Sequence, residues 1–172
     1  MNSQPLKLLA LSGSLRERSS NLSLLRAAQQ LAPATIEIEI YDRIGELPHF
    51  NPDLDEDNPP DAVAHFRAAL EKAAGVIICT PEYAHGLPGS FKNALDWTVS
   101  SGNWMEKPTL ILKSSRSNWA HDSLVEILTT IMAPLSVAPV ELSGNKMDTA
   151  AMLADAKIAA TLRAALEHFT VK

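Results

Sequence analysis

Short apolar runs alternate with amphipathic helical patterns along the whole chain. Residues 6–11 form a nearly continuous apolar run, which is typical of a buried strand. After a Ser-Gly-Ser turn, Leu24, Ala27, Ala28 and Leu31 fall at the i, i+3, i+4 and i+7 positions of one helix face. The alternation continues through strand patterns at 35–41, 75–80, 109–112 and 135–142 and through helical stripes that contain Val63, Phe91, Leu124 and Leu162.

Five strand patterns, each followed by a helical stripe, predict a parallel sheet with helices on both faces. The run 75–80 is almost wholly apolar and belongs in the middle of such a sheet, whereas 35–41 alternates apolar with acidic residues and belongs near an edge. A length of 172 residues fits five strands in the doubly wound order 2-1-3-4-5 better than the larger dinucleotide-binding fold. Residues 1–172 are therefore expected to form a single α/β domain.

In sheets of this kind the ligand lies beyond the carboxyl ends of the strands, so the loops after the first, third and fourth strands are the candidate site. The first loop enters a helix, where backbone N–H groups and the helix dipole favour an anion. It offers hydroxyl, amide and cationic groups that would suit a phosphate monoester: Ser14, Ser19, Ser20, Asn21 and either Arg16 or Arg18. The alternative is a plain helix start, capped by Ser19, Ser20 or Asn21, with the arginines in solvent. The common pyrophosphate and triphosphate motifs, G-x-G-x-x-G here and G-x-x-x-x-G-K-[ST] anywhere, are missing.

The overall charge narrows the range of partners. A formal net charge of −5 disfavours non-specific binding to nucleic acid or to an anionic membrane. No apolar stretch is long enough for a secretory signal or a membrane span, and one cysteine cannot form an internal disulfide, so the chain is expected in the cytoplasm. Cys79 lies in an apolar run and is interpreted as a small buried hydrophobe. Residues 51–61 contain four carboxylates between Asp53 and Asp57 and are expected to form a solvated loop.

The segment after the third strand pattern carries the most informative motif. Residues 80–97 read TPEYAHGLPGSFKNALDW. Together with GSLR at 13–16, Ser19 and Asn21, this segment resembles the NADPH-dependent FMN reductase family, which includes flavin, quinone, azo-dye and chromate reductases. Each motif alone is moderately specific, and the pair in this order and spacing is a strong signal.

The resemblance implies a flavodoxin-like fold that holds FMN non-covalently and accepts hydride from NADPH or NADH. The first loop would hold the FMN phosphate, and the second would line the isoalloxazine ring, with Tyr83 against the ring and Glu82 orienting the loop from behind. A homodimer or homotetramer with the flavin near an interface is also implied. The residues expected to contact the cofactor are Ser14, Arg16, Ser19, Ser20, Asn21, Leu22, Pro81, Glu82, Tyr83, Ala84, His85 and Ser115.

The chain departs from the family pattern at two places. Many family members have asparagine where this chain has Ala84, so one polar contact to the flavin or the substrate is missing. Relatives often have a glycine-rich run after the fourth strand, whereas residues 113–121 contain no glycine. Arg116, Trp119 and His121 would either narrow the pocket or contact the nicotinamide cofactor. The alternative is a capped helix start at Ser117 or Asn118, with the tryptophan partly buried.

Several side chains in or near these loops have two interpretations. His85 is either a proton donor or an exposed loop residue, and no other side chain is expected to be catalytic because the flavin carries the chemistry. Residues 92–97 favour helix packing and an i,i+4 pair between Lys92 and Asp96. The pair Trp104 and Met105, like Trp97, belongs either to a subunit interface or to the core. The remaining histidines show no metal-ligand spacing and are interpreted as surface residues, with no metal expected: His49, His65, His121 and His168.

The sequence therefore predicts an NAD(P)H-dependent FMN reductase or quinone-type oxidoreductase. Its acceptor would be a small molecule, such as a quinone, a flavin, an azo compound or a metal oxyanion, reduced by a ping-pong mechanism. Two other classes stay open. One is a flavodoxin-like electron carrier, against which the GSLR loop argues because carriers use a threonine-rich phosphate loop. The other is a non-catalytic module that binds another phosphorylated ligand, which the two departures keep open.

Overall fold

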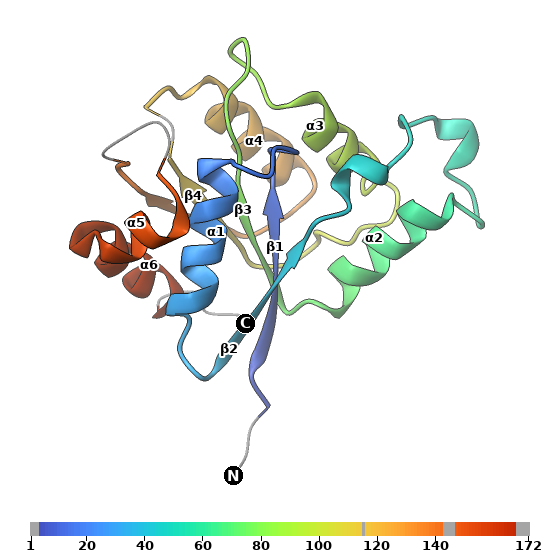
Figure 1. The fold of residues 1–172 in the computed structure, drawn as a ribbon. Helices are drawn as coiled ribbons and strands as arrows, with labels where there is room; N and C mark the ends of the chain where they lie inside the picture. The colour runs from blue at the N-terminus through green and yellow to red at the C-terminus, as the bar shows by residue number, and fades with distance from the viewer. Residues whose placement is uncertain (1–3, 115, 143–146, 168–172) are drawn as a thin grey trace.

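The computed structural model describes residues 4–114, 116–142 and 147–167. Five parallel strands form one sheet in the order β2-β1-β3-β4-β5, as Figure 1 shows. This is the order predicted from the sequence, and the fold is flavodoxin-like. The strands are β1 (Leu6–Ser12), β2 (Ile36–Tyr41), β3 (Gly75–Cys79), β4 (Thr109–Lys113) and β5 (Leu135–Pro139).

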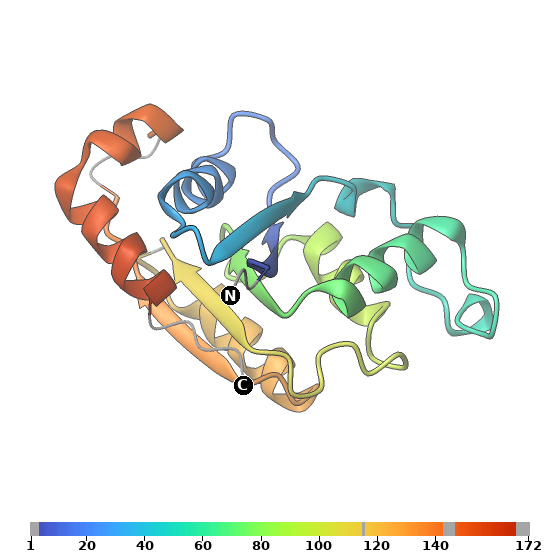
Figure 2. The same ribbon diagram turned by 90° about the horizontal axis from the view of Figure 1, so that it is seen from below.

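Helices cover both faces of the sheet, as the view in Figure 2 shows. On one face lie α1 (Ser20–Leu31), α5 (Thr149–Ala154) and α6 (Ala156–Glu167), and on the other lie α2 (Asp61–Lys72), α3 (Gly89–Asp96) and α4 (Trp119–Thr130). Successive residues of β1 point to opposite faces: Leu8 and Ala10 join the core beneath α1, and Leu9 and Leu11 join the core beneath α2. The near-continuous apolar strand thus fills two cores.

The position of each strand follows from its pattern. All five residues of β3 are buried, because this strand lies at the centre of the sheet with a helix layer on either side. At the edge, β2 buries Ile38 and Tyr41 but exposes Glu37 and Glu39, as its alternation predicts. Parallel pairing places Ser12 beside the last residue of β3, so the loops after β1 and β3 begin side by side. They lie at the top of Figure 1.

The sequence pattern was wrong about the last part of the chain. The fifth strand ends at Pro139 and not at 142, although one further backbone bond runs from the Val140 N–H to the Lys113 carbonyl oxygen at 2.8 Å. The short helix α5 was not predicted. It is separated from α6 by Asp155, whose side chain accepts hydrogen bonds from the backbone N–H groups of Lys157 and Ile158 and so starts a new helix.

The acidic segment is only partly a solvated loop, which corrects the expectation for residues 51–61. The carboxylate of Asp55 is 8% exposed and forms a 2.6 Å ion pair with Arg67 of α2. Arg67 Nε also donates to the Trp97 carbonyl oxygen at 2.8 Å, and the Ser100 hydroxyl donates to the second Asp55 oxygen at 2.6 Å. Arg67 therefore ties the acidic segment to the end of α3, while the neighbouring carboxylates stay in solvent.

Trp97, Trp104 and Met105 were each expected to lie either in a subunit interface or in the core. Two of them lie in the core. Trp97 and Trp104 are fully buried, whereas Met105 is exposed. The indole N–H of Trp97 donates to the Pro48 carbonyl oxygen at 2.7 Å. Across the described ranges, no helix combines the length and apolar character that a membrane crossing requires.

Candidate functional site

The loop after β1 is packed tightly against the end of β3. The Gly13 N–H donates to the Cys79 carbonyl oxygen at 2.9 Å. A side-chain carbon on Gly13 would lie 2.0 Å from the hydroxyl oxygen of Thr80, so only glycine allows the two loops to approach this closely. The Ser14 hydroxyl accepts from the Arg16 N–H at 3.3 Å and gives the loop its bend. These contacts fix the loop in front of the helix that follows it.

Helix α1 begins directly after this loop, with Ser19 at the N-cap position. Within the described part of the chain, Ser19 makes no side-chain capping bond, and the first turn contains no acidic residue. Ser14 and Ser19 are buried, 8% and 6% exposed, while Arg16 and Arg18 reach solvent. The positive end of this helix dipole is thus flanked by two buried hydroxyls and two cations, an arrangement that favours an anion.

Asn21, in the first turn of α1, connects this helix to the end of β3 and to the residue after β4. Its side-chain oxygen accepts from the Ser114 hydroxyl at 3.0 Å and from the Cys79 thiol at 3.1 Å. Burial raises the pKa of Cys79 to about 12, so the thiol stays protonated and donates this bond. Cys79 is buried as expected, but it also orients Asn21. The side-chain oxygen of Asn21 therefore faces neighbouring loops, which the sequence pattern did not indicate.

The loop after β3 contains a tight hairpin turn. The backbone groups of Tyr83 and Gly86 exchange two hydrogen bonds of 3.0 Å, and the two residues between them, Ala84 and His85, have φ angles of 49° and 60°. Positive φ at both central positions defines a type I′ turn, for which asparagine and glycine are the favoured residues. The backbone thus gives a physical reason for the asparagine that the resemblance implies at position 84: alanine is strained in the left-handed region.

Replacing Ala84 by asparagine is expected to raise the free energy of unfolding by about 0.5–1 kcal/mol, because asparagine tolerates the left-handed conformation. Chemical denaturation measures the change. Ala34 is the control: it lies in an exposed turn and is not among the residues with positive φ. Ala34→Asn is expected to give no gain, and equal gains at both positions would contradict the turn argument.

Glu82 joins the β3–α3 loop to the start of α4. Its carboxylate accepts from the Ala120 N–H at 3.0 Å, although Asn118, at the N-cap position, forms no side-chain cap of its own in the described structure. This bond, followed by one from Ser117, lowers the pKa of Glu82. The helix start is therefore capped by a distant carboxylate and not by the side chain of Asn118, one of the two caps that the alternative for this loop assumed. The expectation that Glu82 orients its loop from behind agrees with this contact.

Replacing Glu82 by alanine is expected to lower the melting temperature, because α4 loses its cap and the two loops lose their connection. The pKa of Glu82 is lower in the folded state, so its contribution is complete above the unfolded-state value of about 4.3 and disappears as the pH falls through the folded-state value. Thermal melts of wild type and Glu82→Ala from pH 3 to 7 test this. The melting temperatures of wild type and Glu82→Ala are expected to approach each other at acid pH. Glu126→Ala, on the exposed side of α4, is the control, and its difference from wild type is expected not to change with pH in this way.

Two aromatic rings meet where the loops after β3 and β4 approach each other. The ring centroids of His85 and Trp119 lie 5.3 Å apart with an interplanar angle of 21°, which is a stacked arrangement. Trp119 is 62% exposed and Tyr83 is 50% exposed. The interpretation of Trp119 as partly buried is therefore wrong. His85 is an exposed loop residue, as one of its two interpretations held, and its exposure leaves the proton-donor interpretation untested.

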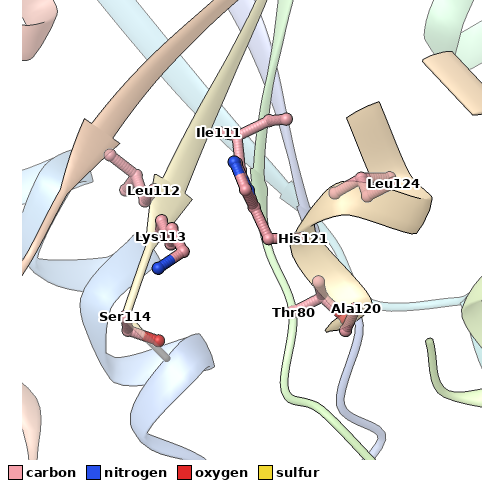
Figure 3. A pocket seen from close by; sticks show the side chains of 8 residues that line it. All are labelled: Thr80, Ile111, Leu112, Lys113, Ser114, Ala120, His121 and Leu124. Atoms are coloured by element: carbon pink, nitrogen blue, oxygen red, sulfur yellow. The ribbon is translucent and has the colours of Figure 1, made fainter. Parts of the chain in front are cut away.

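A small cavity of about 20 Å³ lies between the end of β4 and the start of α4, with room for about one water molecule. Figure 3 shows His121 reaching from α4 toward the strand, with Lys113, Ser114 and Thr80 around the same space. The buried Nδ1 of His121 has no hydrogen-bond partner among the described residues. Burial, followed by the charge of Lys113, lowers the pKa of His121 and keeps the ring neutral at pH 7. His121 is thus partly buried, and its interpretation as a surface residue holds only in part.

Two groups of predicted residues remain, those of α3 and those outside the described ranges. Lys92 and Asp96 form the expected i,i+4 pair at 2.5 Å, and Asn93 ties α3 to the connection between β2 and α2 by accepting from the Phe50 N–H at 2.7 Å. Ser115 and His168 lie outside the described residues. Within the described ranges, no three His, Cys, Asp or Glu side chains gather where they could hold a metal ion.

The site as a whole has two parts at one edge of the sheet. The loop before α1 and the start of that helix present hydroxyls, backbone donors and cations, a donor set that fits a phosphate monoester. The loops after β3 and β4 present backbone groups and exposed aromatic rings, which fit a flat ring system. A flavodoxin-like sheet with these two parts side by side is a mononucleotide-binding protein of the flavin type.

Comparison with known proteins agrees with this class. The family model for NADPH-dependent FMN reductases matches residues 6–147, so the chain belongs to this family. A quinone reductase from Pseudomonas putida is 36% identical over 106 residues, which are 60% of this chain and 56% of that protein. A 2-hydroxy-1,4-benzoquinone reductase from a Burkholderia species is 40% identical over 113 residues, 64% of this chain and 61% of that protein. The chain thus spans less than two thirds of the length of these curated relatives.

A solved structure agrees over a longer range. The flavoenzyme FerB from Paracoccus denitrificans, an NAD(P)H:acceptor oxidoreductase, is 27% identical with a TM-score of 0.78. The match covers 95% of this chain and 94% of the FerB chain. The NADH:FMN oxidoreductase EmoB in its apo form, 20% identical with a TM-score of 0.67, shares the fold. The predicted family and the predicted fold are both confirmed.

Proposed function

We propose that this protein is an NAD(P)H-dependent oxidoreductase that binds FMN non-covalently and reduces a small acceptor of the quinone type. The observation that carries the proposal is the start of α1, which has two buried serines beside it and, among described residues, neither a capping side chain nor an acid in its first turn. Family membership and the names of the relatives support the same activity. The overall reaction is NAD(P)H + H⁺ + quinone → NAD(P)⁺ + hydroquinone.

The FMN phosphate would be held by the loop between β1 and α1. Hydroxyls of Ser14 and Ser19 and backbone N–H groups at the helix start are the donors, and Arg16 supplies positive charge in an otherwise acidic protein. Ser20, Asn21 and Leu22 extend this set along the first turn of α1. The partial charge at the helix start stabilises a dianionic group most strongly when no protein carboxylate competes for it.

The isoalloxazine ring would lie against residues 81–85 and the loop after β4. Backbone groups of Pro81, Glu82 and Ala84 would face the polar edge of the ring, while Tyr83 and His85 would lie beside it and Ser115 would complete the contact. When bound, the flavin supplies two-electron transfer between the nicotinamide and the acceptor. The protein's task is to hold the ring in one orientation, and the Glu82–Ala120 bond supports this by fixing one loop on another.

We further propose that residues 1–172 form a single domain that works in the cytoplasm as a homodimer or homotetramer. Exposed apolar side chains support an association surface: Val99, Met105 and Met132. Light scattering coupled to size exclusion measures the mass in solution. A mass equal to one chain of 18.6 kDa at micromolar concentration would contradict the oligomer.

Steady-state kinetics tests the proposed activity. With NADPH or NADH as donor and a naphthoquinone as acceptor, we expect turnover without a partner protein. Double-reciprocal plots at several acceptor concentrations are expected to be parallel, because donor and acceptor use one site in succession. A protein that takes up FMN but turns over only with an added reductase would be an electron carrier, which would contradict the proposal.

A further inference from the structure

The stacked pair of His85 and Trp119 is a feature that the proposed binding of FMN does not require. The two rings belong to different segments, the hairpin turn after β3 and the first turn of α4, and they meet with centroids 5.3 Å apart. The structure therefore places an indole at the start of α4, beside the hairpin of the candidate site. The site of the proposed acceptor lies at the same edge of the sheet.

Two independent contacts hold this pair in place. The type I′ turn with its two 3.0 Å backbone bonds fixes His85, and the bond between Glu82 and the Ala120 N–H fixes the residue next to Trp119. Both rings are therefore positioned before any ligand arrives. A pre-positioned aromatic surface loses little conformational entropy on binding, which favours recognition.

Trp119 keeps most of its surface in water although it stacks on His85. Its side chain is 62% exposed, and Tyr83, on the same hairpin, is 50% exposed. Large apolar side chains gathered at the mouth of a ligand site mark a recognition surface more often than those scattered over a protein. One face of the indole contacts the imidazole, and the exposed remainder is available to a planar molecule.

We propose that Trp119, backed by His85, forms a stacking wall that selects planar, electron-poor aromatic acceptors. The inference rests on the proposed function and names its acceptor class. The face of an indole carries negative charge density, so it attracts an electron-deficient quinone ring. The reduced nicotinamide ring is neither aromatic nor electron-poor, and a compact inorganic oxidant offers no flat surface. Trp119 therefore acts on the step that uses the acceptor more than on the step that uses NAD(P)H.

Variants at Trp119 test the wall in the FMN-loaded protein. Trp119→Leu keeps an apolar side chain and removes the ring, Trp119→Phe keeps a ring, and Val137→Ala on exposed β5 is the control. The rate constant for reoxidation by 1,4-naphthoquinone is expected to fall about tenfold in Trp119→Leu, since an aromatic contact is worth about one tenfold step. Trp119→Phe and Val137→Ala are expected to stay within about threefold of wild type, the precision of such a comparison.

The other half-reaction and a second oxidant separate specificity from general damage. Reoxidation by ferricyanide is expected to be unchanged in Trp119→Leu, and the rate constant for reduction by NADPH is expected to fall by much less than the rate constant for reoxidation by naphthoquinone. Calorimetric titration of naphthoquinone into the oxidised protein supplies a readout without turnover, and its Kd is expected to rise about tenfold. If the rate constants for reoxidation by naphthoquinone and by ferricyanide fall equally, or if the Kd for naphthoquinone is unchanged, the proposed role of Trp119 is contradicted. A wild type that is not reduced by NADPH would instead overturn the proposed function itself.

Discussion

Replacement of Arg67 by methionine is expected to lower the free energy of unfolding by about 2–3 kcal/mol. The change leaves the Asp55 carboxylate, 8% exposed, without its ion-pair partner and also removes the donor to the Trp97 carbonyl oxygen. The expected loss of free energy of unfolding is smaller than for a fully buried ion pair, because the Arg67 side chain keeps 16% of its surface exposed. Urea denaturation measures it, and Arg163→Met on the exposed side of α6 is the control.

The pH dependence of the same pair gives a second check. Burial alone would raise the pKa of Asp55, but the hydrogen bonds from Ser100 and Arg67 outweigh it and hold the pKa below its usual range. Its contribution is therefore complete above the unfolded-state value of about 3.9 and is lost as the pH falls through the folded-state value. The difference between wild type and Asp55→Asn is expected to shrink in this acid range. A difference in free energy of unfolding that stays constant with pH would contradict the stabilising role of the Asp55–Arg67 pair. So would a loss in Arg67→Met that is no larger than the loss in Arg163→Met.

Replacement of Gly13 by alanine is expected to affect both stability and cofactor binding. The new methyl group would lie 2.0 Å from the Thr80 hydroxyl oxygen, 2.6 Å from its β-carbon and 3.0 Å from its backbone α-carbon, so the two loops must separate. Such overpacking costs about 1–3 kcal/mol, and displacement of the phosphate-binding loop is expected to weaken FMN binding about tenfold or more. Denaturation and fluorescence titration with FMN measure the two effects.

Gly89 offers a matched control for this prediction. It is the first residue of α3, and a side-chain carbon there would meet nothing within 4 Å, so Gly89→Ala is expected to leave stability unchanged or slightly raised. A second variant, Gly13→Ala with Thr80→Gly, removes the two nearest Thr80 atoms, the hydroxyl oxygen and the β-carbon, and is expected to recover part of the FMN affinity. If Gly13→Ala behaves like Gly89→Ala, the close approach of the two loops is not what the site requires.

The fold could be predicted in detail because the order of apolar and polar residues in each strand indicates which of its faces are covered. The apolar run that becomes β3 needs two covered faces, and the acidic alternation of β2 needs one open face, so the sheet order followed from topology rules. The last unit could not be predicted as well. Asp155 divides the final helical segment by capping α6, and an aspartate within a helical pattern does not by itself indicate such a break.

The sequence indicates which loops form the candidate site, but it does not indicate the contacts between them. Hydrogen bonds between segments far apart in the chain have no local signal: Glu82 caps a helix 38 residues away, and Asn21 accepts from a serine 93 residues away. The positive φ angles at Ala84 and His85 were also hidden, because neither residue type indicates a left-handed turn. The exposure of Trp119 could be known only once α4 was placed beside the hairpin.

The most direct test of the proposed function is FMN titration into the apoprotein, followed by anaerobic addition of NADPH with absorbance read at the oxidised-flavin band. We expect one FMN per chain and bleaching of the band within the mixing time of a manual experiment. Absence of FMN binding would contradict the assignment of the loop before α1 and the loop after β3 to a flavin. Binding without bleaching would contradict the reductase activity and leave the chain as a carrier.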